Sequence, residues 1–223
     1  SRKEFFMAFD GITIAAMVSE LNKNLSGGRI NKIAQPESDE LLITGKGANG
    51  QKRLLLSASA SLPLIYFTGK NRISPLTAPN FCMLLRKHIG SARITAIRQP
   101  GLERVVEFEL EHLNELGDVC HKVLIMELMG KHSNIIFCDD NNMILDSIKH
   151  VSCNVSSVRE VLPGRPYFIP HTQDKLDPLT ISREDFMEKV CGRSNAVSKA
   201  LYQTLTGFSP VMAQELCYRT SID

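Results

Sequence analysis

The sequence predicts an α+β fold, in which an antiparallel β-sheet domain is followed by a small helical domain. Segment 104–111 alternates apolar and charged residues, which is typical of an antiparallel strand with one solvated face. The glycine-rich segment 45–50, with its Asn49-Gly50 pair, separates two apolar runs as a hairpin turn does. From Pro163 onward prolines interrupt the chain, and helical patterns then replace strand patterns.

The first expected element is an amphipathic helix that begins after Asp10, a favourable N-cap. Apolar residues follow at helical spacing up to Leu25, and Gly27 suits a left-handed C-terminal cap. Strands are expected at 29–33, 41–44, 53–57 and 64–68. A second helix, from about Pro79 to Ile89, has a proline suited to its first turn and a basic last turn that complements the helix dipole.

Further strands are expected at about 92–99, 104–111, 121–129, 134–139 and 143–150, and short helices at about 182–191, 195–206 and 210–219. We expect residues 1–6 to lie outside the domain, with the natural start at Met7. The expected divisions are then the sheet domain at 7–165, a proline-rich linker at 166–178, and the helical domain at 179–223, which continues beyond this chain.

Charge is distributed unevenly along the chain. Residues 1–100 contain 14 Lys/Arg and 6 Asp/Glu, a net +8, whereas the remainder contains 12 and 18, a net −6. This asymmetry indicates a basic face for a polyanion, unless folding mixes the two halves. No apolar run approaches the ~20 residues of a membrane span. No secretory signal is legible either, so we expect a cytoplasmic protein with no membrane partner.

The six cysteines are scattered, and no two lie within four residues of each other. Such spacing excludes a zinc ribbon and a dithiol redox pair. We expect free, buried thiols in a reducing compartment, and neither a metal nor a cofactor.

Two polar turns are the main candidate binding features, at Pro100–Arg104 and Met129–Asn134. Glu103 and Arg104 suit contact with a phosphate or a base edge. The second turn offers further polar groups, from Lys131, His132, Ser133 and Asn134. For each turn the alternative is an ordinary structural or solvated turn. Neither holds a nucleophile with a partnered base, which favours binding of a large anionic partner over catalysis.

A third candidate lies between the last two expected helices, at Gly207–Pro210. It resembles a helix-hairpin-helix turn, whose backbone N–H groups contact phosphate, although Ser209 replaces the second glycine of that motif. The alternative is an ordinary helix–helix turn. The basic last turn of the second helix adds possible phosphate contacts if it is exposed, through Arg86, Lys87 and His88.

Taken together, several motifs resemble the N-terminal domain of the NFACT family, the bacterial RqcH and fibronectin-binding-protein-A-like group related to eukaryotic NEMF. They are Phe9–Gly11, Gly27–Ile33, Phe81–His88, Pro100–Arg104, Met129–Asn134 and Leu162–Gly164. The resemblance covers the chain from about residue 7 onward.

This resemblance implies a ribosome-associated quality-control factor that is not itself an enzyme. Such a factor binds the large ribosomal subunit with its stalled peptidyl-tRNA and recruits charged tRNA, chiefly alanyl-tRNA, for template-free C-terminal tailing. It also implies a fold like the N-terminal part of formamidopyrimidine-DNA glycosylases, a following helix-hairpin-helix module, and coiled-coil and C-terminal domains that this chain lacks. The catalytic proline of those glycosylases has no counterpart here.

The resemblance also implies roles for particular residues. The family's tRNA-contacting Asp-Arg pair corresponds to Glu103-Arg104, so Arg104 is expected to contact tRNA and Glu103 to orient it. Asp10 matches a family acidic position, and Lys131 stands where many relatives have Arg. A rival from the family's older name, a fibronectin-binding surface adhesin, is disfavoured because no signal or anchor is legible. A DNA-processing enzyme is disfavoured because no nucleophile or metal constellation is present.

Overall fold

The computed structural model describes residues 9–171 and 173–222. The expected start at 1–6 and Met7 therefore lie outside the described residues. Contacts divide the chain into two compact units. The sheet unit comprises residues 18–98 and 105–170, and the helical unit comprises the described residues 9–17, 99–104, 171 and 173–222.

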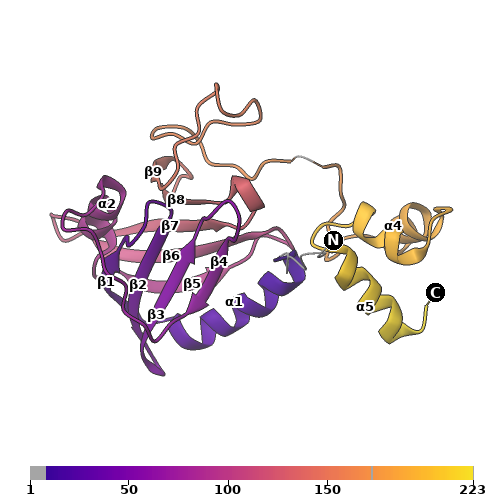
Figure 1. The fold of residues 1–223 in the computed structure, drawn as a ribbon, viewed down its shortest axis with the longest axis horizontal. Helices are drawn as coiled ribbons and strands as arrows, with labels where there is room; N and C mark the ends of the chain where they lie inside the picture. The colour runs from indigo at the N-terminus through magenta and orange to yellow at the C-terminus, as the bar shows by residue number, and fades with distance from the viewer. Residues whose placement is uncertain (1–8, 172, 223) are drawn as a thin grey trace, which may run out of the picture. The chain divides into compact units, whose positions relative to one another are not determined.

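The predicted antiparallel sheet is confirmed and forms the body of the sheet unit (Figure 1). Its nine strands pair in the order β4-β3-β2-β1-β5-β6-β7-β8-β9, and every pairing is antiparallel. The strands are β1 (Arg29–Ala34), β2 (Glu40–Gly47), β3 (Gly50–Ser57), β4 (Leu64–Phe67), β5 (Arg93–Arg98), β6 (Val105–Leu113), β7 (Val119–Glu127), β8 (Asn134–Asp139) and β9 (Ile144–Ser147).

The hairpin between β2 and β3 is tighter than the sequence predicted. Gly47 pairs with Gly50, so only two residues form the turn, and Gly50 adopts a φ of +85° that suits glycine. The glycines at 45 and 47 belong to β2 rather than to a loop. At Gly45 a Cβ would lie 3.2 Å from Leu25 Cδ2, so the missing side chain lets α1 (Gly11–Leu25) approach that side of the strand.

The cap predicted for the first helix is confirmed, because Asp10 Oδ1 accepts a hydrogen bond of 2.8 Å from Thr13 N. Gly27 follows the helix with a φ of +79°, as predicted. The second helix, α2 (Asn80–Ile89), begins one residue later than predicted. Pro79 has extended backbone angles and is the N-cap, not part of the first turn.

In the helical unit the expected helices are present with altered bounds. They are α3 (Arg183–Phe186), continued by a π-helical turn at Met187–Cys191, α4 (Val197–Thr204) and α5 (Pro210–Thr220). Their core contains Val190, Ala200, Leu201, Leu205, Ala213 and Cys217. Leu176 forms a parallel bridge with Leu205, which ties part of the proline-rich segment to α4. The likeness to a glycosylase fold and to a helix-hairpin-helix module stays a prediction.

The expectation of buried cysteines holds for Cys82, Cys138 and Cys217 but is wrong for Cys153 and Cys191, whose side chains are exposed. Burial raises the pKa of the Cys138 thiol to about 12. The two exposed cysteines lie outside the strands and α-helices, whereas Cys120, in β7, is half-buried.

Candidate functional site

The helical unit brings three of the sequence motifs together. Phe9–Gly11, Pro100–Arg104 and Gly207–Pro210 are far apart in the sequence but belong to this one unit. Two glycines allow the close approach. A Cβ on Gly11 would lie 1.9 Å from Leu102 O, and a Cβ on Gly207 would lie 2.6 Å from Leu102 Cβ. The three segments therefore pack backbone against backbone, and neither glycine can be replaced without moving the main chain.

Asp10 links the starts of two helices. Its Oδ1 caps α1, while its Oδ2 accepts hydrogen bonds from Ser209 N (3.2 Å) and Ser209 Oγ (2.7 Å). Ser209 Oγ in turn accepts a hydrogen bond of 3.1 Å from Met212 N and so caps α5. Asp10 is only 6% exposed. Its side chain is occupied in holding the segments together, so in this conformation Asp10 positions the turn, and its tRNA contact stays a prediction.

The Pro100–Arg104 turn is fixed from within the same unit. Glu103 N donates to Pro100 O at 3.0 Å, and Gln99 Nε2 donates to Gly11 O (2.8 Å) and to Glu103 O (2.9 Å). Gly101 has a φ of +51° and lies against the Asp177 carboxylate, whose Oδ2 would be 3.2 Å from a Cβ at that glycine. The turn is thus held on several sides while Arg104 remains exposed at its end.

Arg104 has no ion pair or side-chain hydrogen bond with any described residue, which includes Glu103. A second cation lies near it, the half-buried Lys175. Burial and the positive charge of Arg104 both lower the pKa of the Lys175 ammonium. Arg104 on the fixed turn and Lys175 on the segment before Asp177 are therefore two cations that repel each other, and such a pair is suited to an anionic group that contacts both.

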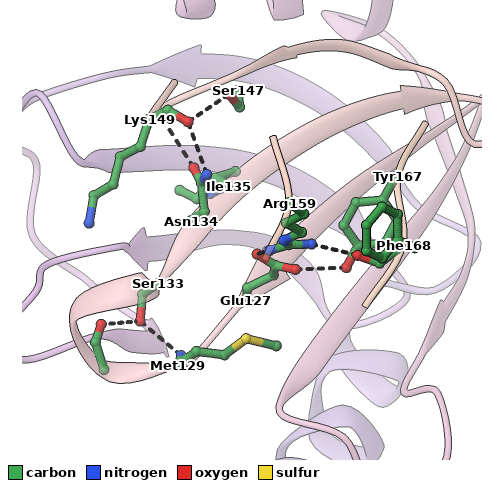
Figure 2. Close-up of polar contacts among 11 residues, drawn as sticks. Glu127, Met129, Ser133, Asn134, Ile135, Ser147, Lys149, Arg159, Tyr167 and Phe168 are labelled. Carbon is green, nitrogen blue, oxygen red and sulfur yellow. Dashed lines mark hydrogen bonds and ion pairs between the residues drawn. The ribbon is translucent and has the colours of Figure 1, made fainter. Parts of the chain in front are cut away.

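The Met129–Asn134 turn belongs to the sheet unit and uses its polar side chains differently (Figure 2). Ser133 Oγ accepts from Met129 N at 2.9 Å and donates to Gly130 O at 2.6 Å. The Asn134 amide donates to Lys149 O (2.9 Å) and accepts from Lys149 N (3.1 Å) and Ile135 N (2.9 Å). Both side chains are buried and occupied by main-chain hydrogen bonds, so in this conformation neither Ser133 nor Asn134 offers a free polar group for the predicted tRNA contact. Lys131 and His132 are exposed.

Next to this turn, at the end of β7, lies a buried polar cluster that the sequence did not reveal (Figure 2). Glu127 is fully buried and forms an ion pair with Arg159 and a hydrogen bond of 2.9 Å with Tyr167 Oη. Arg159 also donates to Phe168 O at 2.6 Å. Burial and the Glu127 carboxylate raise the pKa of the Tyr167 hydroxyl, so it stays a neutral donor. The cluster fastens the segment after β9 to the sheet.

The basic end of α2 is less available than its sequence indicated. Arg86 Nε donates to Ile33 O at 2.7 Å, and His88 is half-buried between His112 and Phe137. Burial, followed by the charge of Lys122, lowers the pKa of His88, which favours its neutral form. Of the three predicted phosphate contacts, Lys87 alone is an exposed cation without such an internal contact among the described residues.

A family model described as the NFACT N-terminal and middle domains matches residues 10–223. The chain belongs to the NFACT family. It is 40% identical over 219 residues to the Rqc2 homolog RqcH of Bacillus subtilis, a match that covers 97% of this chain and 38% of that protein. The chain thus spans well under half the length of that relative.

Solved structures agree with this membership. The N-terminal structure of the fibronectin/fibrinogen-binding protein from Streptococcus suis is 37% identical, with a TM-score of 0.88 over 96% of this chain and 80% of that one. The N-terminal domain of the fibronectin-binding protein PavA from Streptococcus pneumoniae is 36% identical, with a TM-score of 0.86 over the same shares.

For an NFACT chain, the site then divides into two sets of residues. The helical unit gathers Asp10, Glu103, Arg104 and Gly207, whereas Lys131, His132, Ser133, Asn134 and the end of α2 belong to the sheet unit. Lys175 and Gln99 were missed, and the hydrogen bond of Ser209 to Asp10 was not predicted, because these roles depend on segments that are distant in sequence. Among the described residues no three His, Cys, Asp or Glu side chains are grouped to hold a metal ion. None of the described helices is both long and apolar enough to cross a membrane.

Proposed function

We propose that this chain is the RNA-contacting N-terminal portion of a ribosome-associated quality-control factor, and that the Pro100–Arg104 turn contacts tRNA. In this proposal the whole protein binds a large ribosomal subunit with peptidyl-tRNA and recruits alanyl-tRNA for C-terminal tailing of the stalled chain. The similarity to the Rqc2 homolog RqcH of Bacillus subtilis supports the coarse assignment. The protein acts in the cytoplasm, and peptide transfer is carried out by the ribosome, so this chain is not an enzyme.

One observation carries the assignment of the site. Arg104 is exposed, free of internal partners among the described residues, and placed beside Lys175 on a turn fixed by Gln99, Gly11 and Gly101. A planar guanidinium donates to two phosphate oxygens at once, and the neighbouring ammonium adds a point charge. Because the turn is already ordered, binding does not have to order it.

The finer features of the proposal follow from the same family. We propose that the sheet unit has the N-terminal fold of formamidopyrimidine-type glycosylases without their chemistry, and that α4 and α5 form a helix-hairpin-helix-like module. Gly207 then serves mainly to let the turn between these helices pack on Leu102. Glu103 would set the local charge beside Arg104 and accept a hydrogen bond from the RNA.

The direct test is tRNA binding by Arg104→Ala and Arg104→Lys, measured by fluorescence anisotropy over a salt series. Loss of one phosphate contact should weaken binding and reduce the salt slope by about 1, and lysine should restore only part of the affinity. Arg183→Ala is the matched control, because Arg183 is exposed on α3 of the same unit. Unchanged binding by Arg104→Ala, with the melting temperature also unchanged, would overturn the assignment.

A second candidate function is an adhesin that binds fibronectin, and the names of the two solved relatives favour it. The discriminating measurement is fibronectin binding by the same chain, with tRNA as competitor. Saturable fibronectin binding that tRNA does not displace, together with absent tRNA binding, would put the adhesin function first.

A further inference from the structure

A row of like charges crosses the sheet unit. Arg29 of β1 lies directly opposite Lys46 of β2 and, on its other side, directly opposite Arg93 of β5. Residues directly opposite in antiparallel strands lie on the same face, with their Cβ atoms about 5 Å apart. Three cations therefore stand side by side, and like charges in this arrangement destabilise a sheet.

A second row runs parallel to the first. Lys32 lies opposite Thr44, and Thr44 lies opposite Arg53. Thr44 and Lys46 are two residues apart on β2, so both rows belong to one face. We name this surface the basic face, made of Arg29, Lys32, Lys46, Arg53 and Arg93. Among the described residues none of the five forms an ion pair, although Arg29 Nη1 donates to Ser91 O (3.3 Å) and Arg53 Nη1 donates to Gly69 O (3.1 Å), which leaves Lys32, Lys46 and Arg93 without such an internal contact.

The basic face is open to solvent. Neighbouring residues on a strand point to opposite sides, and the Gly45 side of β2 packs against Leu25 of α1, so Lys46 points away from that helix. Arg29, Lys32, Lys46 and Arg93 are exposed, and Arg53 is partly so. Next to Arg53, at the β3 side of the sheet, lies a pocket of about 330 Å³. Lys52 and Phe67 also line this pocket, and none of its lining residues is a carboxylate.

Strands β5, β6 and β7 of the same sheet show that unpaired cations are not a general property of the sheet unit. On β6, Glu109 forms an ion pair with Arg98, and Glu111 lies 3.4 Å from His121 Nε2. Glu111 also lies directly opposite Arg93, so carboxylates of β6 face the cations of β5, whereas no carboxylate lies directly opposite Arg29, Lys32, Lys46 or Arg53 in the pairings of β1, β2 and β3. The four cations on β1, β2 and β3, which no opposed carboxylate compensates, indicate an external anion with several charges.

We infer that the basic face binds the sugar–phosphate backbone of an RNA strand, as a second contact surface separate from the Arg104 turn. The inference rests on the proposed function for its choice of RNA over an acidic protein. Two rows of cations match the repeated charge of a backbone, and the Asn31 and Gln51 amides, joined by a hydrogen bond of 3.3 Å, add polar groups beside them, with Gln51 directly opposite Lys46. Contacts of this kind position a nucleic acid without reading its sequence.

The test uses the 223-residue chain with the double substitution Arg29→Gln and Lys46→Gln. Labelled tRNA and a labelled RNA duplex are titrated over a salt series, and polyglutamate serves as the acidic-protein probe. We expect an affinity for both RNAs lowered by about tenfold, a salt slope smaller by about 2, and a melting temperature unchanged or raised because a repulsion is removed. Arg183→Gln with Lys199→Gln, on the helices of the other unit, is the charge-matched control.

Other outcomes would overturn the inference. RNA binding with unchanged affinity and slope excludes the basic face, while Arg104→Ala in the same assay decides the proposed function separately. Loss of polyglutamate binding alone assigns the face to an acidic protein. Lys32→Gln with Arg53→Gln tests the second row independently, so a folding defect in one variant does not decide the result. Absence of RNA binding by the unsubstituted chain would contradict both proposals.

Discussion

The turn at Pro100–Arg104 in the helical unit and the turn at Met129–Asn134 in the sheet unit put their polar side chains to different uses. In the first, backbone groups and Gln99 fix the loop, and Arg104 is left exposed. In the second, Ser133 and Asn134 are buried and bonded to the main chain. A polar turn therefore indicates a binding site only where its side chains are not needed to hold the turn itself.

The same contrast holds for charge. Beside the second turn, Glu127 and Arg159 neutralise each other in a buried pair. Beside the first turn, Lys175 and Arg104 are both cations, and their positive charges repel each other. We expect substitutions near the second turn to lower stability, and substitutions of the cations near the first turn to leave it unchanged or raise it.

The largest effect is expected for Arg159→Met. This change leaves the buried Glu127 carboxylate without its cation, which typically destabilises a protein by about 3–5 kcal/mol. Urea denaturation measures the free energy of unfolding. Arg165→Met is the matched control, because Arg165 is exposed and its partner Glu160 is partly exposed, so the pair should contribute only about 0–1 kcal/mol. A loss at Arg159 no larger than at Arg165 would show that the cluster is not a structural fastening.

A smaller loss is expected for Asn134→Ala, about 1–3 kcal/mol, because the N–H groups of Lys149 and Ile135 lose their acceptor, whereas Lys149 O keeps the hydrogen bond from Ser147 Oγ. Asn141→Ala is the control on an exposed asparagine and should stay within about 0.5 kcal/mol. Calorimetry or urea denaturation distinguishes the two. If Asn134→Ala instead kept full stability and lost tRNA binding, the contrast between the two turns would fail.

Asp10→Ala should lower stability by about 1–2 kcal/mol, as expected for loss of an N-cap. Asp10→Asn is the conservative comparison, since it keeps an acceptor for Thr13 N but alters the contact with Ser209. Thermal unfolding of both variants should place the asparagine between alanine and the natural residue. Equal stability of all three would mean that Asp10 does not hold the two helix starts together.

Local patterns predicted the elements well, because strand alternation, the Asn49-Gly50 hairpin and the Asp10 cap depend on nearby residues. The resemblance marked Arg104, but no local pattern showed which polar residues would be buried. Ser133 and Arg104 both lie in polar turns of the sequence, and only the fold gives Ser133 its main-chain partners Met129 N and Gly130 O while it leaves Arg104 exposed. The basic face likewise depends on strand register, which places Arg93 opposite Arg29.

The smallest predicted effect tests the first turn most directly, through Lys175→Gln. Burial and Arg104 lower the pKa of Lys175 below its ordinary 10.5, so the folded state holds this proton less tightly than the unfolded chain. The charged lysine therefore destabilises the fold at neutral pH, and this penalty disappears as the pH rises through the ordinary value. We expect Lys175→Gln to have a slightly higher melting temperature than the unsubstituted chain at pH 7. This difference should vanish above about pH 10.5, the unperturbed pKa of lysine.

Lys199→Gln, on the exposed surface of α4, should show no such pH-dependent gain and is the control. If Lys175 contacts tRNA, the Lys175→Gln variant should also bind tRNA more weakly than the unsubstituted chain. A gain in stability with unchanged binding would leave Arg104 as the sole cation of the turn. A loss of stability at pH 7 would mean that Lys175 has an anionic partner within the fold. The contrast between unpaired cations at the first turn and paired charges at the second turn would then no longer hold.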